Sequence, residues 1–200
     1  MDAIRSTRAV LVAAALSLAA GPARAHDPGW TGDVNLLLGG KTLEEDDWGG
    51  LRRQREGGLQ AAFGGRDWPV LLSVEVLGAR SRELADAPFV GLTELTVRTQ
   101  ETNLGVRKFW RPSPRVRPFL GAGFSFIRAE TTARSSSGTV SDSGSGGGVW
   151  LGGGLLFTLG GAFNVGLEAK ASGAEVELGG TEVDAGGGHL GLVIGWHWGG

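Results

Sequence analysis

Apolar and polar residues alternate with period two along most of this chain, most clearly near its end. One set of alternate positions there is entirely apolar: Leu190, Leu192, Ile194, Trp196 and Trp198. The intervening set runs from His189 to His197 and is mostly small or polar. Because successive side chains of a β-strand point to opposite faces, this pattern predicts a strand with one apolar and one polar face.

Seven earlier segments show the same alternation with varying contrast, which makes eight predicted strands. In one of them Glu168 and Lys170 stand between apolar neighbours, as a sheet with one wet face requires. Bacterial single-chain membrane barrels use even numbers of strands, from eight upward. The predicted strands lie at residues 34–38, 59–63, 70–77, 103–110, 120–127, 149–159, 163–172 and 189–198.

The connections between the predicted strands alternate between long and short. Short turns on one side and long loops on the other are typical of outer-membrane barrels. Proline cannot donate a ladder hydrogen bond, so the proline-rich turn at 111–117 is not expected to contain strand. The serine- and glycine-rich stretch 134–148 is expected to be a mobile surface loop. Long connections are predicted at 41–57, 80–93, 131–147 and 173–188, and short ones at 64–69, 111–117 (the proline-rich turn) and 160–161.

Glycine accounts for 37 of the 200 residues, and many glycines lie inside apolar runs. Long helices are not expected, because glycine in a helix interior costs about 1 kcal/mol relative to alanine. Small, glycine-rich polar faces suit the tight interior of an eight-stranded barrel. We therefore predict an all-β fold, an eight-stranded antiparallel up-and-down transmembrane β-barrel. In the alternative, a soluble periplasmic ligand-binding β-barrel, the apolar faces would form the core.

Two consecutive segments carry a resemblance to a known family. Residues 103–109 read Asn-Leu-Gly-Val-Arg-Lys-Phe, and after a short proline-rich turn residues 117–124 read Arg-Pro-Phe-Leu-Gly-Ala-Gly-Phe. This pair resembles consecutive strands of the OmpA-like, OmpX-like and opacity-type outer-membrane β-barrel superfamily, in which a G-x-R-x-F strand precedes a P-[FY]-x-G-x-G strand. The resemblance implies an eight-stranded outer-membrane barrel. Many such barrels end on a phenylalanine, whereas the last aromatic residue here is Trp198.

The first 25 residues have the features of a signal peptide. Arg5 and Arg8 precede an apolar run of about 12 residues, whereas a membrane-spanning helix needs about 20. The small residues around Arg24 predict Sec export with cleavage after Ala25, which leaves one barrel domain at 26–200. Cleavage leaves 16 basic and 20 acidic residues, a mixed balance that does not favour nucleic acid. The chain has no cysteine, so neither disulfides nor a lipoprotein anchor is expected.

The polar faces of the predicted strands bring charged residues into the barrel interior. We expect a structural ion-pair network there, because an unpaired buried charge is costly. Eight strands leave room only for side chains, so this network should plug the interior and prevent a diffusion pore. The expected members are Glu75, Glu101, Asn103, Arg107, Glu168, Lys170 and His189, with His197 on the same face near the other end.

Aromatic residues gather on the opposite face, close to the short turns. Amphipathic rings prefer the interface between membrane and water, so these residues are expected to form a girdle on the periplasmic side. The girdle consists of Trp110, Phe157, Trp196 and Trp198. In the first long connection, the acidic run 44–47 is either a solvated loop or a binding site for Ca²⁺ or for cations that bridge to lipopolysaccharide.

The sequence favours a structural or surface-interaction role over catalysis. An envelope-lipid-modifying enzyme, the alternative, needs a nucleophile such as serine within reach of histidine, and no serine neighbours His189 or His197 in the sequence. These histidines are separated by roughly 26 Å along one strand, so they cannot share a metal ion. No cofactor is expected. The expected partners are outer-membrane lipid, lipopolysaccharide and, during insertion, the barrel-assembly machinery, and the barrel is expected to be monomeric.

Overall fold

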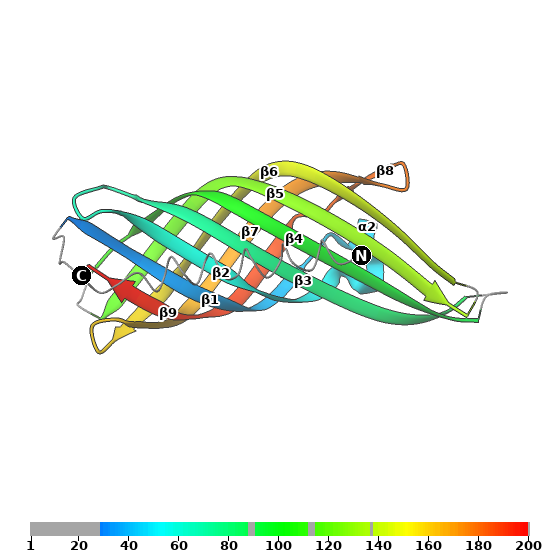
Figure 1. Ribbon diagram of the computed structural model, residues 1–200, viewed down its shortest axis with the longest axis horizontal. Helices are drawn as coiled ribbons and strands as arrows, with labels where there is room; N and C mark the ends of the chain where they lie inside the picture. Colours follow the sequence, from blue (N-terminus) through cyan, green and yellow to red (C-terminus); the bar gives the residue numbers. More distant parts are fainter. Residues whose placement is uncertain (1–28, 88–90, 112–114, 137, 200) are drawn as a thin grey trace, which may run out of the picture.

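The chain forms a closed antiparallel β-barrel (Figure 1). The structure, a computed structural model, describes residues 29–87, 91–111, 115–136 and 138–199, so the expected signal peptide lies outside the described residues. No helix in these ranges is long and apolar enough to cross a membrane. The elements are β1 (Trp30–Thr42), α2 (Glu45–Trp48), the 3-10 helix η1 (Gly49–Arg52), β2 (Arg53–Gly65), β3 (Leu71–Ala87), β4 (Gly91–Phe109), β5 (Val116–Ser135), β6 (Gly138–Leu159), β7 (Phe163–Leu178), β8 (Thr181–Asp184) and β9 (Gly187–Trp198).

Eight of the strands form the ring, as the sequence predicts. Each strand from β1 to β7 pairs antiparallel with the next, and β9 pairs with both β7 and β1. The short β8 forms a hairpin with the end of β7. The start of β1 and the end of β9 lie at the same end as the turns 66–70 and 160–162, the end of β4 and the start of β5, on the left in Figure 1. We call this the short-turn end.

The apolar positions point out of the barrel and the polar positions point in. Leu192 on β9 is 54% exposed and Leu167 on β7 is 57% exposed, whereas Glu75 and Asn103 are completely buried. The predicted assignment of faces is therefore confirmed, and it is the reverse of that in a soluble barrel. The interior also holds an apolar cluster of Leu37, Leu77, Phe119, Leu156 and Val193.

The strands are longer than the sequence predicts, so the expected long loops are largely wrong. The stretch 134–148, expected to be a mobile loop, belongs mostly to β5 and β6, which pair as far as Ser135 and Gly138. Polar residues occupy both faces of the strands here. The alternation of apolar and polar residues therefore disappears from the sequence, although the hydrogen bonds between the strands continue. At the short-turn end β5 begins at Val116, inside the predicted turn, because proline is tolerated near the start of a strand.

Four of the strands extend beyond the closed ring. Pairing between β2 and β3 stops at Arg55 and Arg80, whereas β4 and β5 remain paired as far as Glu94 and Arg134. The outer parts of β3, β4, β5 and β6 therefore form a four-stranded sheet, on the right in Figure 1, which we call the protruding sheet.

The first connection folds back and closes the barrel interior at this end. Trp48 of α2 is buried, and its indole Nε1 donates a hydrogen bond to the Asp184 carbonyl at 2.6 Å. Apolar side chains from the connection pack against inward-facing residues of β4 and β5 and against the β7–β9 region. This apolar cap consists of Leu43, Trp48, Val97, Ile127, Ala129, Ala174, Val176 and Ala185.

Candidate functional site

Charged side chains from several strands meet in the barrel interior. Arg107 Nη2 on β4 donates hydrogen bonds to Glu75 Oε1 at 2.6 Å and to Glu168 Oε1 at 2.8 Å. Lys170 Nζ on β7 lies 3.0 Å from Glu75 Oε2 and 3.4 Å from Glu101 Oε1. One arginine and one lysine thus connect carboxylates from three strands, β3, β4 and β7.

The same network continues up to the apolar cap. Glu101 accepts hydrogen bonds from Lys41 Nζ at 3.0 Å and from Asn103 Nδ2 at 2.8 Å. Lys41 Nζ also donates to the carbonyl of Ala185, a cap residue, at 2.8 Å. A buried ammonium group therefore fixes the cap to the charged interior.

The structure brings all seven predicted interior residues into this network and adds further residues. Lys41 and Glu56 were expected in a loop, but β1 and β2 extend far enough to turn both side chains inward. Gln60 Nε2 donates to Glu168 Oε2 at 3.0 Å. We call the whole set the central network; it comprises Lys41, Glu56, Gln60, Glu75, Glu101, Asn103, Arg107, Glu168, Lys170, Ser172 and His189.

One corner of the central network has the arrangement of a serine–histidine–carboxylate triad. Ser172 Oγ on β7 lies 3.0 Å from His189 Nε2, and His189 Nδ1 lies 2.8 Å from Glu56 Oε1. Sequence proximity could not reveal this contact, because the serine comes from the neighbouring strand. Ser172 Oγ also donates a hydrogen bond to Glu101 Oε2 at 3.2 Å, and while its single proton is held there it cannot donate to His189 Nε2.

A second polar cluster lies near the short-turn end. Arg117 donates two hydrogen bonds to Asp33, from Nη1 at 2.7 Å and from Nη2 at 2.9 Å, and its guanidinium stacks 4.8 Å from the centre of the Phe109 ring. Asn164 Nδ2 donates to Asp33 Oδ1 at 2.7 Å, and His197 Nδ1 lies 3.3 Å from the same oxygen. Arg117 was missed because it falls in the proline-rich turn of the sequence.

The predicted girdle residues all point outward near the short turns. Trp110, Phe157, Trp196 and Trp198 are each at least 40% exposed. Two further tryptophans, Trp30 and Trp68, lie at the same end with their ring centres 5.8 Å apart.

The acidic run of the first connection is dispersed. Glu45 forms a salt bridge with Arg52, and Asp47 Oδ2 accepts a hydrogen bond from the Asp184 backbone N–H at 2.8 Å. Within the described ranges, no group of three or more histidine or acidic side chains is arranged to hold a metal ion.

The geometry predicts that Arg107 stabilises the barrel strongly. Arg107→Met leaves Glu75 and Glu168 without their shared cation, so the unfolding free energy should fall by roughly 3–5 kcal/mol. Adding Glu75→Gln and Glu168→Gln should restore part of the loss, because the stranded charges are removed. Urea unfolding measures both effects, with Lys108→Met on the exposed face of β4 as the control. An Arg107→Met loss as small as that of Lys108→Met would contradict the interpretation.

Comparison with solved structures identifies the fold. The attachment invasion locus protein Ail of Yersinia pestis, solved in complex with the heparin analogue sucrose octasulfate, superposes with a TM-score of 0.56 at 16% identity, over 85% of this chain and 99% of Ail. OprG of Pseudomonas aeruginosa gives 0.53 at 10% identity, over 85% and 96% of the two chains. Neisserial surface protein A gives 0.52 at 13% identity, over 85% and 97%.

The sequence comparisons add nothing to this, since no protein-family profile and no curated protein sequence matches the chain. The structural likeness, together with the closed ring of eight antiparallel strands, agrees with the resemblance seen in residues 103–124. The chain therefore has the closed eight-stranded antiparallel β-barrel fold that these solved proteins share.

Proposed function

We propose that this protein is a monomeric integral barrel of the bacterial outer membrane, with a structural or surface-interaction role. Its signal peptide is removed after Ala25, the barrel-assembly machinery inserts it, and the protruding sheet faces outward. The observation that carries this proposal is the apolar outer surface. Soluble monomers rarely expose apolar patches larger than a few hundred Å². Here every barrel strand presents a leucine that is at least 36% exposed: Leu36, Leu59, Leu72, Leu104, Leu120, Leu151, Leu167 and Leu192.

The girdle residues support the same placement in the bilayer. Tryptophan rings favour the interface between lipid and water, and those of Trp110, Trp196 and Trp198 border the leucine surface at the short-turn end. This end then faces the periplasm. The proteins of known structure that share the fold are outer-membrane proteins, which supports the location.

Above the leucine surface, three exposed arginines lie directly opposite one another on adjacent strands. Arg55 on β2 is paired with Arg80 on β3 and Arg80 with Arg98 on β4, and the row ends at Glu130 of β5, opposite Arg98. Like charges in opposed positions repel, and no salt bridge to these arginines occurs among the described residues. A surrounding layer of anions removes the repulsion, and lipopolysaccharide phosphates supply one at this height.

A shallow groove continues from the arginine row. It has a volume of about 500 Å³ and is lined by Gln100 and Thr102 of β4, Phe126 and Arg128 of β5, and the small residues 145–147 of β6. Gln100 lies opposite Arg128 in the ladder, two residues from Arg98 on the same face. The guanidinium group of Arg128 and the aromatic ring of Phe126 both line this groove, a combination that suits a phosphorylated lipid. We therefore assign the arginine row and the groove to contact with lipopolysaccharide.

Hydrolysis of an envelope-lipid ester is a second candidate, favoured by the Ser172–His189–Glu56 contacts alone. The distances match those of a nucleophile, a base and an orienting carboxylate. However, Glu101 lies against the serine hydroxyl, where its negative charge opposes a developing oxyanion. His189 and Glu56 are buried beneath the cap, so a substrate would have to displace it. The structural role is therefore preferred.

The filled interior predicts the absence of an open pore. Purified protein in a planar bilayer should give no steady single-channel current, because the central network and the apolar cap occupy the interior. Reproducible stepwise currents from protein freed of other porins would contradict the proposed plug.

The arginine row predicts stabilisation by lipopolysaccharide. Adding lipopolysaccharide to phosphatidylethanolamine vesicles should raise the unfolding free energy of the wild-type barrel by roughly 1 kcal/mol per engaged arginine. The combined variant Arg55→Gln, Arg80→Gln, Arg98→Gln should lose most of this gain. Arg134→Gln, an exposed charge at the far end of β5, should keep it and serves as the control. An equal gain in the triple variant would refute the assignment.

The second candidate is tested by Ser172→Ala and His189→Ala. If the Ser172–His189–Glu56 contacts are only structural, neither variant should change the acylation of lipid A or of phospholipids. Cells that express either variant should then have the same acylation as cells that express the wild-type chain. Mass spectrometry of extracted lipids makes the comparison, with a strain lacking the protein as the reference. A lipid species that depends on the wild-type chain and disappears in both variants would establish the enzyme.

A further inference from the structure

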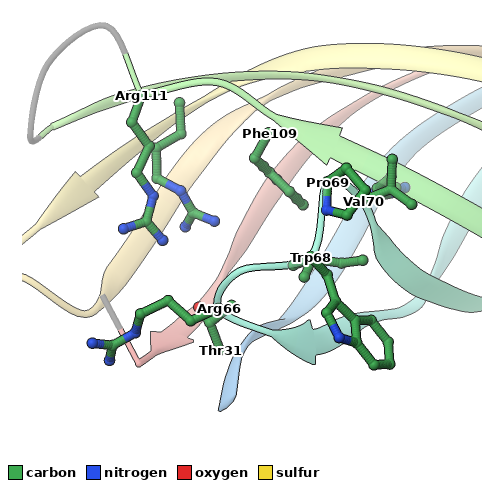
Figure 2. A pocket seen from close by; sticks show the side chains of 10 residues that line it. Thr31, Arg66, Trp68, Pro69, Val70, Phe109 and Arg111 are labelled. Carbon is green, nitrogen blue, oxygen red and sulfur yellow. The ribbon is translucent and has the colours of Figure 1, made fainter. Parts of the chain in front are cut away.

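A pocket opens at the short-turn end of the barrel, away from the arginine row. It has a volume of about 240 Å³ and lies between the 66–70 turn and the part of β4 and β5 near Arg111 and Arg117 (Figure 2). Its lining combines polar and apolar side chains from four strands and two turns. They are Thr31, Arg66, Trp68, Pro69, Val70, Leu71, Arg107, Phe109, Arg111 and Arg117.

Four of these ten residues are arginines, and none is acidic. Arg107 and Arg117 are paired with interior carboxylates, but Arg66 and Arg111 make no salt bridge with any described residue. The only side-chain hydrogen bond of Arg111 there is a 3.3 Å contact between its Nη2 and His197 Nε2. Figure 2 shows the side chains of Arg66 and Arg111 on the same side of the pocket. The pocket therefore carries an excess of positive charge.

The arginines are close enough to influence one another. Partial burial, together with the nearby charges of Arg117 and Arg66, lowers the pKa of Arg111, while Asp33 opposes the shift. Arginine stays protonated even when its pKa is lowered, so Arg111 continues to be repelled by the positive charges of Arg117 and Arg66. A bound anion relieves this repulsion.

The two deeper arginines are already held in place. Arg117 is fixed by its two hydrogen bonds to Asp33 and by the Phe109 ring, and Arg107 by Glu75 and Glu168. Both guanidinium groups are at least 97% buried, yet the Nε atom of each has no hydrogen-bond partner. These two Nε atoms are closed off from solvent, so Arg107 and Arg117 act on the pocket through their charge.

We propose that this pocket binds a phosphate group. Guanidinium groups recognise phosphate through paired, charge-assisted hydrogen bonds. Arg66 and Arg111 can make such bonds here, and Arg107 and Arg117 add positive charge. The volume far exceeds the roughly 30 Å³ that one water occupies in the liquid, so a phosphate with an attached organic group fits. The source is a membrane phospholipid headgroup or a small soluble phosphate, and both present the same chemistry.

The wall opposite the arginines is apolar. Trp68 is 49% exposed and packs over Gly64 and Gly65, where a Cβ atom would come within 2.8 Å of its ring. Trp68, Pro69 and Val70 all line the pocket. A glycerol or acyl segment attached to the phosphate can lie against this wall.

The test uses the purified full barrel in a phosphate-free maltoside detergent at constant ionic strength. Inorganic phosphate is titrated by calorimetry in one arm, and dihexanoyl phosphatidylglycerol in the other. Arg111→Gln and Arg66→Gln should each weaken binding about tenfold, the equivalent of roughly 1.4 kcal/mol. Both residues are exposed, so their loss should leave the fold intact. Arg115→Gln, an exposed arginine of the same turn that does not line the pocket, is the matched control and should change affinity less than about twofold.

Binding of either probe that depends on Arg111 and Arg66 but not on Arg115 supports the site, and the arm in which it occurs identifies the source. Binding in both arms identifies phosphate itself as the recognised group. No heat from either probe overturns the proposal, and so does an equal loss in Arg115→Gln, which would show only diffuse attraction to positive charge.

Discussion

The closed hydrogen-bonded ring is the constraint on which the rest of this structure depends. A strand edge in hydrocarbon would leave backbone groups without partners, and the pairing of β9 with β1 removes both edges. Once the ring is closed, the outward side chains that meet hydrocarbon can be apolar. The inward side chains are then separated from bulk water and have to satisfy one another, which makes the charged interior a consequence of the ring.

The interior of an eight-stranded barrel is so narrow that the same side chains must both pair their charges and fill the space. Arg107 holds two carboxylates and at the same time lies 4.8 Å from the centre of the Phe119 ring. Lys41 joins the network to the cap, so the polar interior and the apolar closure above it support each other. The two ends differ in charge. One end is closed by an apolar cluster, and the other opens into a pocket with arginines in excess.

The sequence predicts the ring well because lipid on one side and packed polar groups on the other impose strict alternation. Glu168, Lys170 and His189 were assigned to the interior from that alternation alone. The protruding sheet was missed because its strands have similar surroundings on both faces. Lys41 and Glu56 were missed for a related reason, since they lie just beyond the apolar stretches of β1 and β2. The Ser172–His189 contact depends on cross-strand register, which the composition of a single strand does not encode.

The central claim is that the apolar face meets lipid and the charged face is enclosed. Cell fractionation followed by gel electrophoresis in SDS, with and without boiling, tests it most directly. The account predicts that the protein is found in the outer-membrane fraction, and that the unheated band migrates differently from the boiled one because the closed barrel resists SDS. A soluble periplasmic protein whose mobility does not change on heating would contradict it, because the outward leucines would then have to form a core.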